Sequence, residues 1–424
     1  MAPSKAFGKY RPIAELGRGG MAVVYLAASQ GPRGFSKLVV VKELKEEFSQ
    51  DAEFASMFVD EARLAARLAH RNIVQTYEVE EQQNHFFIVM EYLEGQPLSQ
   101  TRSRLARLGG QLRDHQVRVL CDVLDALHYA HELADYDGTP LNVVHRDVSP
   151  HNVIITYGGE AKLVDFGIAK AADSTSHTRT GVIKGKLAYM APEQAFGKPL
   201  DRRADVFAVG VILWEAITGR RMWKGNAEGA IAHRLSIGDI PKIAEHTADA
   251  PPMLKGICER ALTPRAEDRY PSAAAMRQDL EAYLASLVHK PTARDLGGLL
   301  ASAFAEERGR IAVLVEEQMR TLRAEQPETS APQELPRIQS ALQSMTPHAN
   351  TPASRSGPMS VRMSSSATVH PATGGGYPIR WLVLGGLVLI VIGAAATTAI
   401  MQPWSQTPAA PQPPPSVAVP DASR

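Results

Sequence analysis

The sequence predicts an α+β fold with two lobes, and the order of its strand-like and helical patterns is the reason. A helical pattern over residues 51–69 interrupts the strand-like runs, and helical patterns dominate from about residue 114 onwards. Runs of strands followed by runs of helices are typical of α+β folds. The apolar runs typical of strands lie at residues 10–16, 22–28, 38–41 and 86–90.

The charge balance argues against a nucleic-acid-binding protein. The 424 residues contain 46 basic and 45 acidic side chains, a formal net charge of +1. A chain without a basic excess has no global field that attracts a polyanion, so no nucleic-acid partner is expected. The two cysteines, Cys121 and Cys258, cannot form a disulfide framework and are expected to be buried thiols in a reducing compartment.

Shifts in composition divide the chain into segments. Residues 326–379 are rich in Ser, Pro and Thr and poor in apolar residues, which is typical of a disordered linker. The first ten residues contain no apolar h-region, so a secretory signal peptide is not expected. The segments are an N-terminal tail (1–9), a globular domain (10–288), a helical extension (289–325), the disordered linker (326–379), a transmembrane helix (380–401) and a short Pro-rich extracytoplasmic tail (402–424).

The transmembrane prediction rests on residues 381–400, an uncharged apolar run of about 20 residues. As a helix this run matches a hydrocarbon thickness of about 30 Å. Trp381 and Trp404 flank it, as interfacial aromatic residues do. Arg380 precedes it and no Lys or Arg follows before Arg424, so the positive-inside rule places the N-terminal part in the cytoplasm. We expect a single-pass protein of the inner (cytoplasmic) membrane; the alternative is a buried core helix.

A glycine-rich turn separates the first two strand-like runs. Its sequence is Gly17-Arg18-Gly19-Gly20-Met21-Ala22-Val23-Val24. Glycine lets backbone N–H groups approach phosphate oxygens without a side chain in the way. No helical pattern follows the turn directly, which argues against a dinucleotide-binding βαβ unit. Taken alone, the turn fits either a phosphate-binding loop or a plain hairpin turn.

A lysine ends the next apolar run, Val39-Val40-Val41-Lys42, and it needs a partner if it is buried. The helical pattern that follows supplies one, because Glu61 lies in the middle of its apolar stripe. A carboxylate on a core-facing stripe is costly unless a cation meets it. We expect an ion pair between Lys42 and Glu61, which is either part of a site or a structural salt bridge.

Polar side chains gather at the ends of two later strand-like runs. Asp and Asn oxygens are hard ligands that suit Mg²⁺ carrying phosphates. Asp147 can also accept a proton from a hydroxyl group. The motifs are His145-Arg146-Asp147-Val148-Ser149-Pro150-His151-Asn152, then Asp165-Phe166-Gly167, then Ala191-Pro192-Glu193.

Taken in order, these motifs resemble those of the protein kinase family, and specifically the bacterial kinases of the eukaryotic (Hanks) type. The resemblance covers residues 10–288 and rests on the whole series of motifs. Two further residues match: Asp205 resembles the buried aspartate that supports the catalytic loop, and Arg269 resembles the arginine that pairs with Glu193. The resemblance implies a protein kinase fold, with a strand-rich first lobe and a helical second lobe.

The resemblance also implies a role for each catalytic residue. Lys42, held by Glu61, would contact the α- and β-phosphates of ATP. Asp147 would accept the proton of the substrate hydroxyl. Asn152 and Asp165 would hold Mg²⁺. Positioning and neutralisation of charge would supply most of the catalysis.

The expected nucleotide site follows from the same resemblance. Residues 91–93 look like the hinge that binds adenine, with Met90 before them as the gatekeeper. ATP and Mg²⁺ are the cofactors that the resemblance implies. The expected nucleotide contacts are Leu16, Gly17, Gly19, Gly20, Val24, Lys42, Glu91 and Leu93.

Three positions depart from the family pattern. Ala22 replaces the third glycine of the loop and is small enough to be tolerated. Ser149 stands where serine/threonine kinases usually carry a lysine, and Lys186 stands where they usually carry a threonine. We hypothesise that Lys186 acts catalytically by reaching Asp147 and the γ-phosphate, because a lysine side chain is long and flexible. The alternative is that Lys186 points into solvent.

Hydroxyl residues cluster between Asp165 and Glu193 and predict regulation by phosphorylation. Arg146 lies beside the expected base, and pairing of its guanidinium with a phosphate would order this segment. The alternative is a flexible polar loop. The candidate phosphorylation sites are Ser174, Thr175, Ser176, Thr178 and Thr180.

The sequence therefore predicts a membrane-anchored serine/threonine protein kinase that acts on protein substrates in signal transduction and autophosphorylates its activation loop. The alternative is a pseudokinase-like membrane scaffold, whose mark would be loss of Lys42, Asp147 or Asp165; none is lost. A tail of about 23 residues after the apolar run leaves no room for a sensor domain, which argues against a ligand-binding receptor. Inputs are expected through the cytoplasm, through membrane partners or through formation of a homodimer.

Overall fold

The structure is a computed structural model of the chain, and it describes residues 7–31, 36–82, 85–107, 112–166 and 187–324. The chain divides into two units, residues 1–334 and 335–424, and every described residue belongs to the first. Within the described residues, no helix has both the length and the apolar character needed to cross a bilayer. The predicted membrane segment, the linker and the tail lie outside the described residues.

Five antiparallel strands form the sheet of the first lobe, in the order β1-β2-β3-β5-β4. Four of them correspond to the strand-like runs predicted from the sequence. Strand β4 is not predictable from the apolar pattern, because its sequence TYEVEEQ is dominated by charged and polar residues. The strands are β1 (Tyr10–Arg18), β2 (Ala22–Gln30), β3 (Ser36–Leu44), β4 (Thr76–Gln82) and β5 (His85–Glu91).

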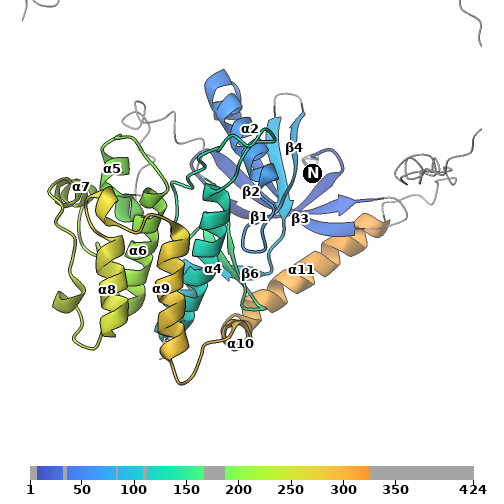
Figure 1. The fold of residues 1–424 in the computed structure, drawn as a ribbon. Helices are drawn as coiled ribbons and strands as arrows, with labels where there is room; N and C mark the ends of the chain where they lie inside the picture. The colour runs from blue at the N-terminus through green and yellow to red at the C-terminus, as the bar shows by residue number, and fades with distance from the viewer. Residues whose placement is uncertain (1–6, 32–35, 83–84, 108–111, 167–186, 325–424) are drawn as a thin grey trace, which may run out of the picture. The chain divides into compact units, whose positions relative to one another are not determined.

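The two faces of this sheet carry separate apolar clusters, and Figure 1 shows α2 beside the sheet. One face carries Leu44 and Ile88 and packs against α2 (Ala52–Arg67), which follows the short α1 (Glu46–Ser49). The opposite face carries a separate apolar cluster. Lys42 is paired with Ile88 across the sheet, so its side chain lies on the same face as α2.

The second lobe is helical and is built around α6 (Arg203–Thr218), in which every residue from Ala204 to Ile217 is buried. Helix α6 contacts α4, α8 and α9, as Figure 1 shows. A small sheet of β6 (Gly95–Pro97), β7 (Val153–Thr156) and β8 (Ala161–Leu163) lies in the same lobe. The other helices are α3 (Leu98–Arg107), α4 (Arg113–His131), α5 (Pro192–Ala195), α7 (Glu228–Ser236), α8 (Pro252–Ala261) and α9 (Ala273–Ser286), with 3₁₀ turns η3 (Leu187–Tyr189), η4 (Ile243–Glu245) and η5 (Ala266–Asp268). A strand-rich lobe followed by a helical lobe confirms the predicted α+β fold.

Two helices, α10 (Ala293–Ala303) and α11 (Ala305–Ala324), follow the second lobe. Helix α10 begins with a capping box, in which Thr292 and Asp295 bond to each other's backbone N–H groups. Its residues Leu296 and Leu300 are buried in the core of the second lobe. Helix α10 is therefore packed as part of the folded domain.

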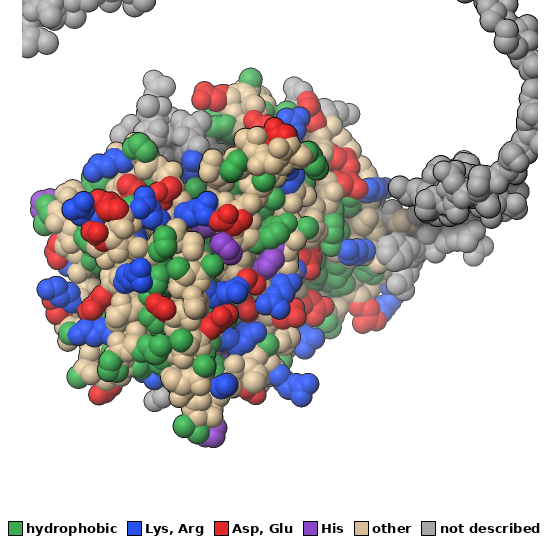
Figure 2. Space-filling model, viewed as in Figure 1, with side chains coloured by type: hydrophobic (Ala, Val, Ile, Leu, Met, Phe, Trp, Pro, Cys, Tyr) green, Lys and Arg blue, Asp and Glu red, His purple; other side chains and the backbone are tan. Residues whose placement is uncertain are grey.

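The two cysteines are buried free thiols, as predicted. Burial raises the pKa of Cys121 to about 12 and raises the pKa of Cys258 well above its ordinary value. Both thiols are therefore protonated and unreactive at neutral pH. On the surface, acidic and basic side chains are interspersed over the face drawn in Figure 2, in keeping with the net charge of +1.

Candidate active site

The first feature of the site is a strained loop between α4 and β7 that a buried carboxylate holds in place. The carboxylate of Asp205, on α6, accepts the backbone N–H of His145 at 2.8 Å and that of Arg146 at 2.9 Å. It also accepts the ring N–H of His131 at 2.8 Å. Arg146 has a φ of 65°, a conformation that costs free energy in a residue other than glycine. The two backbone bonds to Asp205 fix that conformation, in the supporting role predicted from the sequence.

The environment of Asp205 keeps it ionised. Burial alone would raise its pKa, but the hydrogen bond and the charge of His131, with the backbone N–H of His145, lower the pKa below its ordinary value. An ionised carboxylate is a stronger acceptor than a neutral group, and its side chain is only 1% exposed. Asp205 is thus a fixed negative charge beneath the loop.

Asp147, the expected base, lies on this loop next to the expected metal ligand Asn152. The Asn152 amide nitrogen donates to the Asp147 carbonyl oxygen at 2.9 Å and to its carboxylate at 3.1 Å. With the amide nitrogen directed at Asp147, the amide oxygen of Asn152 remains available as a ligand. The backbone N–H of Val164 donates to the carbonyl of Asn152 at 2.9 Å, which brings Asp165 to the same end of the small sheet.

Lys42 reaches across to this end of the sheet from β3. Its ammonium lies 2.8 Å from an oxygen of Asp165 and 3.6 Å from an oxygen of Glu61 on α2. Burial would lower the pKa of Lys42, but the charges of Asp165 and then of Glu61 outweigh it and raise the pKa above its ordinary value. Asp165 has a φ of 56°, a second left-handed residue at the site. The structure thus brings together Lys42, Glu61 and Asp165, three of the predicted catalytic residues.

The donor set fits Mg²⁺. Asn152 supplies an amide oxygen and Asp165 a carboxylate, both hard ligands, and Mg²⁺ characteristically completes its shell with phosphates and water. The described residues contain no cluster of three or more His, Cys, Asp or Glu side chains that could hold a metal ion without such help. A cation at this site would therefore depend on the nucleotide for part of its coordination.

The expected nucleotide contacts lie on the edges of the first lobe. In the glycine-rich turn, the N–H of Gly19 donates to the carbonyl of Ala22 at 2.8 Å, and Leu16 is exposed. Gly17 and Val24 are paired in the β1–β2 ladder. A cavity of about 20 Å³ is lined by Met90 together with Lys42, Glu61 and Asp165.

The hinge carries an ion pair that no pattern in the sequence predicts. Glu91 ends β5, and its carboxylate accepts the Lys162 ammonium of β8 at 2.8 Å. The backbone N–H of Glu91 donates to the carbonyl of Gln75 at 2.9 Å, and Leu93 is half-buried. The Glu91 carboxylate is therefore already engaged, by the Lys162 ammonium and by the backbone N–H of Gln75.

A second ion pair fastens the segment after the site. The fully buried Arg269 guanidinium donates two hydrogen bonds to the Glu193 carboxylate, at 2.6 and 2.8 Å, and forms the predicted ion pair. The neighbouring Gln194 donates from its side-chain amide to the carbonyl of Arg146 at 2.6 Å. This contact, which sequence patterning does not reveal, ties α5 to the loop that carries Asp147.

Several predicted residues lie outside the described part of the chain. They are Gly167, the candidate catalytic Lys186, and the candidate phosphorylation sites Ser174, Thr175, Ser176, Thr178 and Thr180. Ser149, the other half of the hypothesised exchange with Lys186, is described and is buried. The hypothesis therefore stays a prediction.

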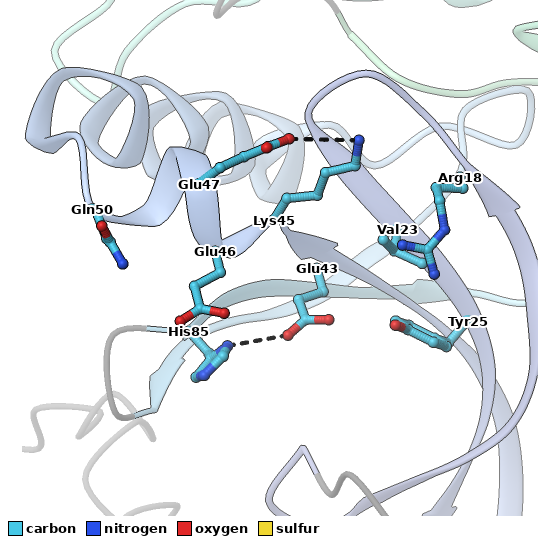
Figure 3. A pocket seen from close by; sticks show the side chains of 9 residues that line it. All are labelled: Arg18, Val23, Tyr25, Glu43, Lys45, Glu46, Glu47, Gln50 and His85. Carbon is cyan, nitrogen blue, oxygen red and sulfur yellow. Dashed lines mark hydrogen bonds and ion pairs between the residues drawn. The ribbon is translucent and has the colours of Figure 1, made fainter.

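A larger hollow, of about 610 Å³, lies elsewhere in the first lobe (Figure 3). Glu43 and His85 line it, with His85 Nδ1 3.2 Å from a carboxylate oxygen of Glu43, and the Lys45 ammonium lies 3.8 Å from the carboxylate of Glu47. None of the residues predicted to act in catalysis lines it. The volume of a hollow therefore does not locate the chemistry in this molecule. The remaining lining residues are Arg18, Val23, Tyr25, Glu46 and Gln50.

Comparison with known proteins agrees with this geometry. The family model described as the protein kinase domain matches residues 10–280. The chain is 44% identical over 307 residues to the tyrosine-protein kinase MasK of Myxococcus xanthus. The matched region covers 71% of this chain and 47% of MasK. It is 34% identical to the probable serine/threonine-protein kinase PknB of Lactococcus lactis, over 64% of this chain and 41% of that one.

Solved structures give the same result for the fold. The crystal structure of the Mycobacterium tuberculosis PknI kinase domain is 26% identical and matches with a TM-score of 0.50. The match covers 66% of this chain and 98% of that domain. By contrast, the chain spans less than half the length of MasK and PknB, so the match to those proteins concerns only part of each.

Proposed function

The chain belongs to the protein kinase family, among the bacterial kinases of the Hanks type, and we propose that it transfers the γ-phosphoryl group of ATP to serine and threonine hydroxyls of proteins. The observation that carries the proposal is the convergence of Lys42, Glu61 and Asp165 beside a loop that presents Asp147. These groups come from both lobes. A salt bridge that only stabilised the first lobe would need Lys42 and Glu61 but would not need Asp165 and Asp147 beside them.

The described side chains account for the steps of the transfer. The Lys42 ammonium, oriented by Glu61, would bind the α- and β-phosphates, and Asn152 and Asp165 would hold Mg²⁺, which neutralises the charge of the phosphates. Asp147 would orient the substrate hydroxyl and take its proton as the oxygen bonds to the γ-phosphorus and the bond to the ADP oxygen breaks. Fixed charges and fixed geometry supply the catalysis.

The test is phosphoryl transfer by the full chain with labelled ATP and Mg²⁺. Lys42→Ala, Asp147→Asn and Asp165→Asn should each lower the rate by at least about 100-fold. Exposed Asp249→Asn, a matched substitution away from the site, should leave the rate unchanged. A wild-type rate in the Asp147→Asn variant would contradict the assignment of Asp147 as the base. If the wild-type chain phosphorylates no protein, the pseudokinase-like scaffold is favoured.

Serine/threonine specificity is the finer part of the proposal. Most of the relatives named here support serine/threonine specificity: PknB, PrkC and PknL are called serine/threonine kinases, while MasK is called a tyrosine kinase. Ser149 argues in the other direction, because it replaces the lysine usual in serine/threonine kinases. Phosphoamino-acid analysis of the product decides between the two acceptors.

The exchange of Ser149 and Lys186 remains part of this proposal. Lys186→Thr is expected to lower the rate strongly, and Ser149→Lys combined with Lys186→Thr is expected to restore part of it. An unchanged rate in Lys186→Thr would mean that Lys186 has no catalytic role.

Regulation and location complete the proposal. We expect autophosphorylation among residues 174–180, since charge added there would meet Arg146 beside Asp147. We also expect the apolar run 381–400 to anchor the protein in the inner membrane with the kinase domain in the cytoplasm. Protease added to intact cells should then remove only the tail; digestion of the kinase domain would reverse the orientation.

A further inference from the structure

The loop that follows α6 carries three cations in five residues. Gly219 caps the C-terminal end of α6, and its φ of 68° turns the chain out of the helix. Arg220, Arg221 and Lys224 follow and are all exposed. Among the described residues they form no ion pair, whereas Arg234, which lies over the Trp223 ring, is paired with Asp239. We name Arg220, Arg221 and Lys224 the basic ledge.

Hydrogen bonds fix this loop beside the segment that precedes Glu193. The indole N–H of Trp223 donates to the carbonyl of Ala188 at 3.0 Å. The backbone N–H of Met222 donates to the buried carboxylate of Glu215 at 3.2 Å, and the hydroxyl of Tyr189 donates to the same carboxylate at 3.2 Å. Trp223 and Met222 are buried, so the ledge is held on a rigid base and does not depend on a freely moving loop.

The surroundings leave the ledge positive. Glu215 could cancel a cation, but its carboxylate is already paired with Arg102 at 2.6 Å and is only 4% exposed. Arg221 is close enough to act on Tyr189, where its charge opposes the rise in pKa that burial and Glu215 cause. The segment 187–189 leads directly to α5, which bonds to the catalytic loop through Gln194. The ledge is therefore connected through two short contacts to the loop that carries Asp147.

We infer that Arg220, Arg221 and Lys224 determine substrate specificity by recognising acidic residues that flank the phosphorylated hydroxyl. This inference rests on the proposed kinase function. Charge complementarity selects an anionic segment, since exposed guanidinium groups bind carboxylates and suppress basic competitors. Each exposed pair contributes roughly two- to five-fold in affinity at low salt, so three cations together give a preference of about ten-fold or more.

The test compares three serine peptides that differ only in flanking Glu, Gln or Lys residues. The wild type should show a kcat/KM about ten-fold higher for the Glu peptide than for the Gln peptide, mainly through KM, and the ratio should fall towards one at high salt. Arg220→Glu with Arg221→Glu should reverse the order of the Glu and Lys peptides. Lys290→Glu with Arg294→Glu, the same charge change at two exposed cations elsewhere, should keep the wild-type order.

Each outcome separates the inference from the proposed function. Transfer to all three peptides at equal kcat/KM would contradict the specificity role of the basic ledge but would agree with the proposed kinase function. Transfer to none of the peptides would contradict the proposed kinase function itself. A reversed-charge variant that loses kcat equally on every peptide, with the Glu preference intact, also overturns the ledge. That result would mean that the cations support transfer itself and do not select the substrate.

A second inference concerns the two C-terminal helices, which lie beyond the residues matched by the kinase family model. Helix α10 is fastened to the second lobe by close backbone packing: a Cβ added at Gly159 would lie 1.8 Å from the carbonyl oxygen of Ala293, and one at Gly297 would lie 2.7 Å from that of Tyr157. Phe304, between the two helices, is buried under the guanidinium of Arg104 at 5.0 Å from its ring.

Helix α11 then continues from the second lobe past the hinge to the first lobe. Its residue Glu307 pairs with Arg104 of α3. Its residue Arg308 lies 3.5 Å from Glu94, just after the hinge, and 5.0 Å from the ring of Tyr157. Further along, α11 contacts β1, the strand that leads into the glycine-rich turn, and Figure 1 shows it extending from beside β6 towards that sheet. One helix therefore contacts both lobes and the hinge segment between them.

We propose that α11 is a positioning element, which sets strand β1 and the glycine-rich turn relative to the second lobe. A rigid helix anchored at one end by α10 limits how far the lobes separate, so its loss should weaken ATP binding more than it slows transfer. The pair Arg104–Glu307 at the start of α11 is the place to test this, because neither residue touches the predicted nucleotide or metal contacts.

The experiment is a charge swap in the full chain. Arg104→Glu and Glu307→Arg are each expected to raise KM for ATP about three- to ten-fold with little change in kcat, and the two together should restore KM. Arg265→Glu, at an exposed pair with Glu267, is the matched control. A lower melting temperature without a change in KM would mean that α11 only stabilises the fold and would overturn the proposal, as would a swap that fails to rescue.

Discussion

Two charged clusters in this kinase differ in what their charges do. Beneath the catalytic loop, Asp205 is 1% exposed and accepts three hydrogen bonds, two of which hold the backbone of His145 and Arg146. In the hollow of Figure 3, by contrast, the side chain of Arg18 is 60% exposed and that of Glu47 is 66% exposed. The charges beneath the loop are buried, paired and fixed before any ligand arrives, whereas those of the hollow are largely exposed to water.

The physical reason is the difference in solvent. A buried charge that is fully hydrogen-bonded interacts strongly with its neighbours, and removing one partner leaves the others unsatisfied. An exposed pair is screened by water and salt and is worth at most about 1 kcal/mol. The comparison therefore predicts large effects beneath the loop and small effects in the hollow.

The largest effect is expected from Asp205→Asn. The amide presents an N–H group where the carboxylate accepted backbone N–H groups, so Arg146 should leave its left-handed conformation and Asp147 should move. A displacement of about 1 Å at a catalytic group costs roughly 100-fold in rate. Transfer assays on the full chain should show that loss in kcat, and a variant with wild-type kcat would contradict the role given to Asp205.

A strong effect on stability is expected from Glu193→Gln. The Arg269 side chain is fully buried, and it would keep its charge while losing the partner that neutralises it. Loss of one member of a buried pair costs about 3–5 kcal/mol. Denaturant unfolding should show this decrease in the free energy of unfolding. Glu267→Gln, at the exposed pair with Arg265, is the control and should change it by less than about 0.5 kcal/mol.

A smaller effect concerns pH. Because the pKa of Asp205 is lower in the folded protein than its ordinary value of 3.8, its ionised form stabilises the fold above that value. This contribution is lost as the pH falls through the folded pKa, that is, below about 4. The difference in unfolding free energy between wild type and Asp205→Asn should be constant from pH 5 to 7 and shrink below pH 4. A difference that grows on acidification would have the wrong sign.

The sequence predicts one kind of contact in this site and misses another. The pairs Lys42–Glu61 and Glu193–Arg269 belong to motifs, so residue type and order in the chain are enough to predict them. The bond from Gln194 to the carbonyl of Arg146 joins a common side chain to backbone 48 residues away, and no pattern marks it. Contacts of this second kind depend on how the chain packs.

The same distinction applies to whole elements. Strands with apolar alternation are predictable, while β4 is not, because Glu78, Glu80 and Glu81 hide its pattern. The helical pattern after residue 289 predicts helices, but where they pack depends on glycine contacts such as Gly159 with α10. The pair Glu91–Lys162 likewise forms only because the hinge and β8 meet in the folded domain.

The smallest effect is expected in the hollow, from Glu47→Gln. The Glu47 carboxylate lies 3.8 Å from the Lys45 ammonium and is mostly exposed, so the pair is screened and its loss should change the unfolding free energy by less than about 0.5 kcal/mol. The rate of transfer should stay within about two-fold of wild type, since Lys45 keeps its bond to the carbonyl of Gly20 at 2.6 Å and the glycine-rich turn keeps its support. Steady-state kinetics and denaturant unfolding on the same preparation measure both quantities. A ten-fold loss of activity at unchanged stability would break the comparison, because an exposed charge far from Asp147 would then be acting on the reaction, and the hollow would have to be treated as a second functional site.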